Sequence, residues 1–142
     1  MGVRVRLRIK SAGKTVETTA LVNTGFETEQ PEILLPANLA EKLGLYPPAE
    51  GSTLEEYSVV GGKTLIIKSS QPAEVQVLVK DRNTNPVMAV PIISSEETEV
   101  LISDKLASKL KLSIDDPGEG LWRFRDEPPT KTRTSVPPEY WR

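Results

Sequence analysis

The residues of this chain whose types and spacing could carry chemistry are Asn23, Thr24 and Gly25. They follow the apolar run Ala20-Leu21-Val22 and precede a polar loop and a second apolar run, Ile33-Leu34-Leu35. A strand that is buried on both faces reads as a continuous apolar run. The three polar residues are therefore expected at the end of a buried strand, which suits either an active-site turn or an ordinary loop.

The composition limits the chemistry that such a turn could perform. The chain has no cysteine and no histidine, which excludes disulfides, thiolate metal sites, imidazole zinc sites and the Ser-His-Asp triad. A carboxylate-held metal is the remaining metal site. However, Glu96-Glu97 and Asp115-Asp116 are interpreted as solvated turns, and no tight acidic cluster follows a predicted strand. We therefore expect no metal and no cofactor.

Length and charge narrow the class of protein. A chain of 142 residues is long enough for one domain with a substantial core. The net charge of -2 gives no overall attraction to nucleic acid or to an anionic membrane. The apolar runs are too short to span a bilayer, and the N-terminus alternates charged with apolar residues, unlike a signal peptide. The sequence predicts a cytoplasmic protein without nucleic-acid or membrane partners.

The first quarter of the chain predicts a β-hairpin and then a strand–helix unit. Alternation over 3–10 indicates a half-buried strand, and 15–23 reads as its returning partner. A short buried strand at 33–35 leads into Pro36, which can open a helix over 37–43, and Gly44 can end it.

The remainder of the domain predicts mostly strands. They are expected at 54–60, 63–69, 74–80, 87–93, 100–102 and 121–124. Gly61-Gly62 predicts a tight hairpin between the first two. Pro91 lacks an N–H, which favours an edge or a bulge for its strand. Ser103 is expected to cap a helix that runs to about Lys111. The apolar strand Leu121–Phe124 is expected to be exposed and to need a covering partner.

The last segment differs in composition. We place a domain over 1–125 and a Pro-rich extended tail over 126–142, where Pro128-Pro129 and Pro137-Pro138 bracket a charged stretch. Tyr140-Trp141 is unusual at a disordered end, because disordered segments are poor in aromatic residues. This pair predicts that the tail docks on its own domain or on a partner subunit.

An internal repeat links the two predicted helices. Leu39–Leu45 and Leu106–Leu112 share the wording Leu-Ala-x-Lys-Leu-x-Leu, and each follows a short apolar strand. The repeat favours two related strand–helix units over a coincidence between amphipathic helices. The fold class that follows is mostly β with two short α-helices.

The order of these elements over Val3 to Phe124 resembles the retropepsin-like aspartic protease family, in particular its small single-domain microbial members. The resemblance is carried by Leu-Val-x-Thr-Gly at residues 21–25, by Ile-Leu-Leu-Pro at 33–36, and by the Gly-tipped hairpin. It implies a closed, barrel-like β-fold and a homodimer in which each subunit supplies one residue to a shared site. An extended peptide or an unfolded protein segment would be the partner.

The resemblance also implies roles for single residues. Asn23 stands where the family has the catalytic Asp of an Asp-Thr-Gly triplet. Thr24 would hydrogen-bond across the two-fold axis, and Gly25 would let the backbone approach the substrate. Phe26 would contact the substrate. The tip formed by Val60, Gly61 and Gly62 would close over the substrate as a flap.

Asn23 is a departure that bears directly on activity. In such a dyad two carboxylates about 3 Å apart share one proton, and the ionised one activates water. An amide cannot accept that proton, so a symmetric dimer of this chain lacks its general base.

Two explanations of Asn23 are open: an engineered substitution and natural inactivity. Ser103 stands where the family usually has Gly, and two departures around one site favour natural inactivity. Two other functions are also open. One is a non-catalytic peptide-binding module of the same fold, and the other is a structural β-barrel dimer.

Overall fold

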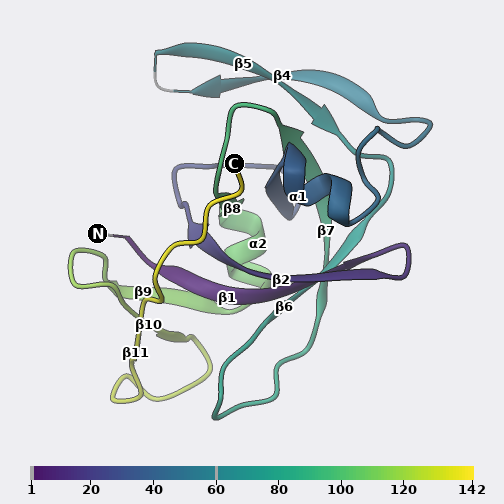
Figure 1. Ribbon diagram of the computed structural model, residues 1–142. Coiled ribbons are helices and arrows are strands. Elements are labelled where there is room, and N and C mark those ends of the chain that lie inside the picture. Colours follow the sequence, from purple (N-terminus) through teal and green to yellow (C-terminus); the bar gives the residue numbers. More distant parts are fainter. Residues whose placement is uncertain (1, 60) are drawn as a thin grey trace.

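The structure is a computed structural model that describes residues 2–59 and 61–142. Its elements in chain order (Figure 1) are β1 (Arg4–Ser11), β2 (Lys14–Val22), β3 (Glu32–Pro36), α1 (Ala37–Lys42), β4 (Thr53–Val59), β5 (Gly62–Lys68), β6 (Ala73–Val77), β7 (Val87–Ser94), β8 (Val100–Ile102), α2 (Asp104–Lys109), β9 (Leu112–Asp116), β10 (Leu121–Phe124) and β11 (Arg133–Thr134).

Six of the strands close into a barrel. They follow the order β3-β8-β2-β1-β6-β7, and pairing of β7 with β3 closes the ring. Strands β5 and β4 continue from β7 as a hairpin outside the ring, at the top of Figure 1. The expected fold class is confirmed at this level, since the chain is mostly β, has a closed barrel and carries two short helices.

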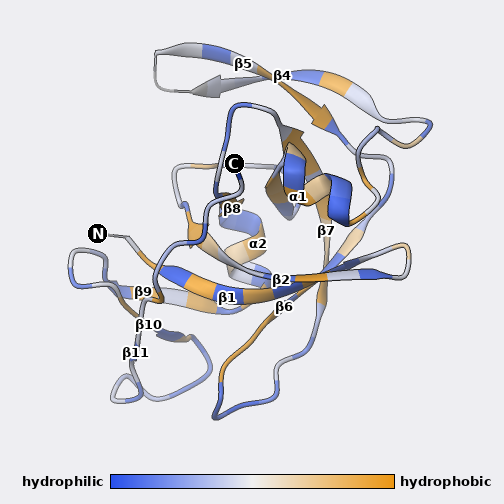
Figure 2. Cartoon of the chain, viewed as in Figure 1, coloured by the Kyte–Doolittle hydropathy of each residue, from blue (hydrophilic) through white to orange (hydrophobic). Residues whose placement is uncertain are grey.

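The barrel interior is filled by the alternating side chains that the sequence predicts. In β1, Leu7 and Ile9 are fully buried while Arg6 points to solvent, and Figure 2 shows the same alternation as colour along this strand. Leu39 of α1 and Leu106 of α2 are also fully buried. Burial of each such Leu or Ile side chain contributes about 1.5–3 kcal/mol to the free energy of folding, so this core is the main source of stability.

The strand pairing has the two-fold pattern that the repeat predicts. Strand β2 pairs in parallel with β8, and β7 pairs in parallel with β3. The two inner strands, β3 and β8, pair antiparallel with Leu34 opposite Leu101. The units β2–β3–α1 and β7–β8–α2 are therefore related by an approximate two-fold through this central pair.

Pro91 does not lie in an edge strand, so the edge alternative of that prediction is wrong. Strand β7 is interior and pairs with β3, β5 and β6. On one side, its first residues pair with β6 and its last residues pair with β5. Pro91 stands where the partner changes, and its carbonyl accepts from the Ser69 N–H at 3.0 Å. The missing N–H therefore falls at a gap in the ladder.

The hairpin forms as expected, but the turn is placed differently. Gly62 is part of β5 and pairs with Val59, so it does not belong to the tip. Gly61 has a φ of 90°, a conformation that L side chains rarely adopt and that glycine allows. Val60 lies outside the described residues.

The strand β10 is not exposed, so the prediction that it needs a covering partner is wrong. It lies between β9 and β11 in a three-stranded sheet. Strand β9 includes Asp115 and Asp116, where the sequence predicts a turn. Trp122 is 3% exposed and Phe124 is 1% exposed. The chain supplies its own cover here, and this strand gives no argument for a dimer.

The end of the chain docks on its own barrel, where it runs past β1 in Figure 1. The Val136 N–H donates to the Arg4 carbonyl at 3.1 Å, and the Glu139 N–H donates to Thr19 Oγ1 at 2.9 Å. The Trp141 indole N–H donates to Thr18 Oγ1 at 2.9 Å. The sequence predicts that the tail docks either on its own domain or on a partner subunit. In the structure it docks on its own domain.

Candidate functional site

The Asn23 turn is fixed by backbone and side-chain hydrogen bonds at the end of β2. The Asn23 N–H donates to the Ile102 carbonyl of β8 at 3.1 Å, and the Phe26 N–H donates to the Asn23 carbonyl at 3.0 Å. The side-chain Oδ1 of Asn23 accepts from the Gly25 N–H at 3.2 Å. An Asn that bonds the backbone two residues on is a common way to stabilise a turn.

Thr24 and Gly25 have no role within this chain that requires their identity. Gly25 does not have a positive φ, and a Cβ there would lie 3.4 Å from Asn23 Oδ1, which is close to ordinary contact. The Thr24 side chain is exposed and makes no hydrogen bond with the described part of the chain. The described part of the chain therefore gives no reason for the identity of either residue.

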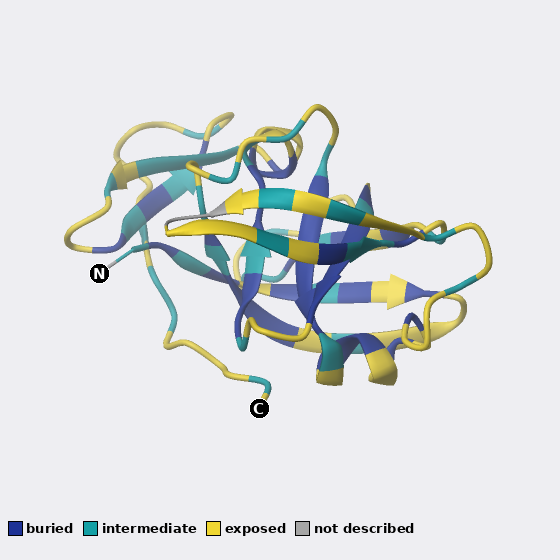
Figure 3. Ribbon diagram, turned by 90° about the horizontal axis from the view of Figure 1, so that it is seen from above, coloured by how far each residue is buried: buried dark blue, intermediate teal, exposed yellow. Residues whose placement is uncertain are grey.

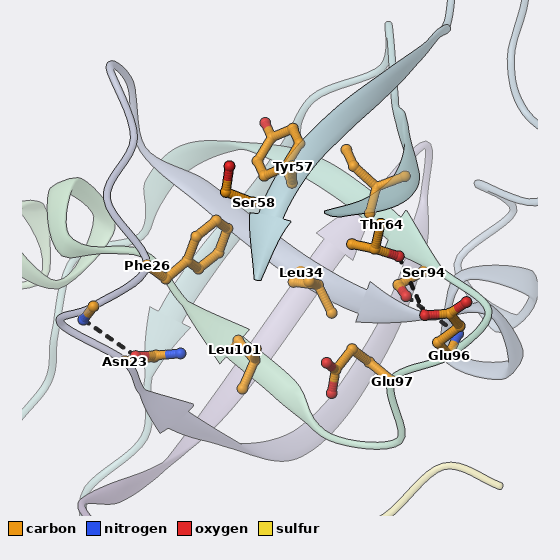
Figure 4. A pocket seen from close by; sticks show the side chains of 12 residues that line it. Asn23, Phe26, Leu34, Tyr57, Ser58, Thr64, Ser94, Glu96, Glu97 and Leu101 are labelled. Carbon is orange, nitrogen blue, oxygen red and sulfur yellow. Dashed lines mark hydrogen bonds between the residues drawn. The ribbon is translucent and has the colours of Figure 1, made fainter. Parts of the chain in front are cut away.

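A cleft of about 750 Å³ lies between this turn and the β4–β5 hairpin. Its described lining residues are Asn23, Gly25, Phe26, Leu34, Tyr57, Ser58, Thr64, Ile66, Ser94, Glu96, Glu97 and Leu101. Figure 4 shows the arrangement: Asn23 and Phe26 lie at one end, Leu34 and Leu101 form the floor, and Glu96 and Glu97 lie at the other end. The floor is thus the central pair of the internal two-fold.

The hairpin forms the roof of the cleft. Seen from above in Figure 3, its exposed strands lie across the buried strands of the barrel. Strand β5 attaches it to β7 through Ile67 and Lys68. Leu34, Ile66 and Ile92 form a small apolar cluster under it, separate from the barrel core, with Phe26 and Tyr57 packed against the cluster.

Tyr57 also connects the roof to the barrel through a polar contact. Its ring meets Phe26 edge to face at 6.4 Å between centroids, and its hydroxyl donates to Glu32 Oε1 at 2.6 Å. Glu32 is 3% exposed, and its Oε2 lies 3.8 Å from Lys68 Nζ. Burial, and then the hydrogen bond to Glu32, raises the pKa of Tyr57 well above its usual value.

We predict that Tyr57→Phe lowers the free energy of unfolding by about 1–3 kcal/mol at neutral pH, because the buried carboxylate loses its donor. The raised pKa keeps the Tyr57 proton in the folded state where the unfolded state loses it. The contribution is therefore complete below pH ~10 and is lost as the pH rises further.

Urea unfolding of both proteins across this pH range is the measurement, and the difference between them should shrink above pH ~10. Tyr46→Phe is the matched control, since Tyr46 is 38% exposed and is expected to change stability little. A Tyr57→Phe effect no larger than the control would show that the hydrogen bond to Glu32 does not hold the roof.

Ser103 has a structural role that accounts for its presence. It is fully buried, and its Oγ accepts from the Leu106 N–H of α2 at 3.2 Å, so the predicted helix cap is confirmed. The same oxygen accepts from the Glu32 N–H at 3.0 Å. Because Ser103 serves two backbone donors here, it is not informative about lost catalysis.

The structure brings together three of the residues that the sequence singled out, Asn23, Gly25 and Phe26. Thr24 is not among the described lining residues, and neither are Gly61 and Gly62. The hairpin contributes its inner face instead, with Tyr57 opposite Thr64. Strand alternation could have identified this face once the turn was placed correctly.

The sequence predicts a solvated turn at Glu96 and Glu97, and both residues are exposed, yet they line the cleft. The internal repeat was the signal that could have found them, because their loop between β7 and β8 corresponds to the Asn23 loop between β2 and β3.

Within the described residues, no group of three or more acidic, His or Cys side chains is placed to hold a metal ion. No helix of the described residues is long and apolar enough to cross a membrane.

Among the described lining residues, the ionisable side chains are Tyr57, Glu96 and Glu97, and none of them belongs to the Asn23 turn. Asn23 presents an amide, and the floor is apolar. An elongated ligand with its own polar backbone would find hydrogen-bonding groups at the walls and apolar contact below. Comparison of the chain with models of known protein families and with curated proteins found no match.

Proposed function

We propose that this chain is a retropepsin-like module that holds an extended peptide segment in the cleft without cleaving it. The observation that carries the proposal is the cleft itself. A fixed turn at the end of β2 faces a β-hairpin across an apolar floor of Leu34 and Leu101. Together with the order of the elements, this arrangement supports the resemblance to the retropepsin-like family.

An extended peptide suits the chemistry of the lining. Asn23, Ser58, Thr64 and Ser94 provide neutral hydrogen-bonding groups around the apolar floor. A peptide in extended form presents N–H and C=O groups to such walls and alternate side chains to floor and roof. The absence of hydrolysis follows from Asn23, whose amide cannot take a proton from water.

The binding test uses fluorescently labelled peptides from an unfolded protein. Fluorescence anisotropy should show saturable binding, and mass spectrometry of the same mixtures should show intact peptides at every pH from acid to neutral. Binding without cleavage is the expected result. Cleavage by the unmodified chain would contradict the proposed role of Asn23. Absence of binding across a varied peptide set would favour a structural barrel.

We further propose a homodimer with the Asn23 turns of both subunits at the two-fold axis. Thr24 and Gly25 are exposed, and no described contact within one subunit requires either residue type. This observation supports the dimer. A shared cleft would give both residues a partner across the axis. Sedimentation should then show about twice the 15.6 kDa chain mass.

We predict that Asn23→Cys is cross-linked to a covalent dimer by a short bifunctional thiol reagent. The chain has no other cysteine, so every link must join the two positions 23. Glu119→Cys, on an exposed turn beyond β9, is the control and should link far more slowly. Equal slow linking of both variants, with a monomer in sedimentation at micromolar concentration, would rule out this dimer.

A further inference from the structure

The cleft has one charged end, and the internal two-fold explains where it lies. The Asn23 turn follows β2, and the loop that carries Glu96 and Glu97 follows β7, the strand that corresponds to β2 in the other unit. The two loops therefore approach the Leu34–Leu101 floor from opposite ends (Figure 4). The polar neutral residue Asn23 lies at one end, and two carboxylates lie at the other.

These carboxylates are the charged groups among the described lining residues, and no Lys or Arg side chain there offsets them. The two lysines of the hairpin strands are paired elsewhere, because Lys63 contacts Glu56 and Lys68 contacts Glu32. Glu96 Oε2 accepts from Thr64 Oγ1 at 3.2 Å. The Glu97 carboxylate has no hydrogen bond or ion pair within the described part of the chain and lies beside Leu101 in Figure 4.

The loop that presents Glu97 is held in place on both sides. Before it, the Glu96 N–H donates to Ser94 Oγ at 3.2 Å, and Ser94 is buried. After it, the Thr98 carbonyl accepts from the Trp141 N–H of the docked tail at 2.6 Å. Glu99, 9% exposed, forms an ion pair with Arg4. A braced loop costs little ordering entropy when a ligand binds, so the backbone that carries Glu97 is pre-organised at the edge of the cleft.

We propose that the cleft selects peptides that carry a lysine or arginine side chain at the position facing Glu97. This inference rests on the proposed peptide-binding function and names its substrate class. The aliphatic stem of the basic side chain would lie on the apolar floor at Leu101, and its charged head would reach the Glu97 carboxylate. A charge-assisted hydrogen bond is stronger than one between neutral groups.

The test compares two labelled peptides that differ at one position, lysine in one and acetyl-lysine in the other. Acetylation removes the charge and keeps the aliphatic stem. The full-length chain should bind the lysine peptide about 5- to 10-fold more tightly at low salt, because a hydrogen bond to a charged group is stronger than one between neutral groups and solvent at the exposed rim weakens it. Raising the salt concentration should reduce the preference.

Glu97→Gln should abolish the preference, so that the lysine peptide binds no more tightly than the acetyl-lysine peptide. Glu119→Gln is the matched control, because it removes the same charge from an exposed turn outside the cleft and should keep the preference. A preference that survives Glu97→Gln, or equal binding of both peptides by the unmodified chain, overturns this inference and leaves the proposed function in place. If neither peptide binds, the proposed function fails, and this inference fails with it.

Discussion

Replacing Asn23 by Asp is expected to create peptidase activity about 10²- to 10⁴-fold above that of the unmodified chain, the usual contribution of a positioned general base. The turn should survive the change, because a carboxylate oxygen can accept the Gly25 N–H that Asn23 Oδ1 now accepts at 3.2 Å. In the proposed dimer, two such carboxylates would share one proton, and the ionised one would activate water.

Cleavage of an unfolded protein, followed by mass spectrometry across acid to neutral pH, is the measurement. Activity should be highest at acid pH, where one proton remains on the pair, and a statine-type transition-state mimic should inhibit it. Asn85→Asp makes the same chemical change at an exposed loop position and should stay inactive. An inactive Asn23→Asp that remains folded and dimeric would show that the shape of the cleft, and not one atom, prevents hydrolysis.

Replacing Phe124 by Ala is expected to lower the free energy of unfolding by about 3–5 kcal/mol, the usual cost of removing a fully buried aromatic side chain. Phe124 is 1% exposed and packs edge to face on Trp122 with 5.1 Å between ring centroids. The guanidinium groups of Arg82 and Arg133 lie 4.3 and 4.8 Å from the centre of its ring. These contacts join β10 to the tail and to the loop after β6.

Urea unfolding at two protein concentrations separates this effect from any effect on association. Phe124→Leu is the control, since a large apolar side chain should retain much of the packing and lose less stability. A change below about 1 kcal/mol in Phe124→Ala, combined with a shift in oligomeric state, would contradict the structure. It would instead support an exposed strand that a partner subunit covers.

Much of the barrel could be predicted because its signals are local. Alternation gives β1 directly, and the side chain of Ser103 caps α2 as its position before an acidic first turn suggests. The repeated wording of the two helices anticipates the two-fold pairing of β3 with β8. Each of these features depends on residues that are close in sequence or on a pattern that repeats.

The parts that could not be predicted depend on distant partners. The Arg4 N–H donates to Ser135 Oγ across 131 residues, and no local pattern announces that contact. Pro91 indicates a missing donor, but only the change of partner along β7 shows that no donor is needed there. For the site, the apolar run before Asn23 identifies one end of the cleft. Glu97 at the other end becomes visible only once the two-fold brings its loop to the same floor.

The most direct measurement of the central claim is the location of a bound peptide on the folded chain. Backbone amide signals of the isotope-labelled protein would be followed by NMR during titration with a lysine-containing extended peptide. We expect shifts at Asn23, Gly25 and Phe26, at the inner face of the hairpin around Thr64, and at Glu97. Shifts confined to another surface, such as the groove between Val5, Trp122 and Arg133, would contradict it, as would no shift at peptide concentrations that saturate the anisotropy signal.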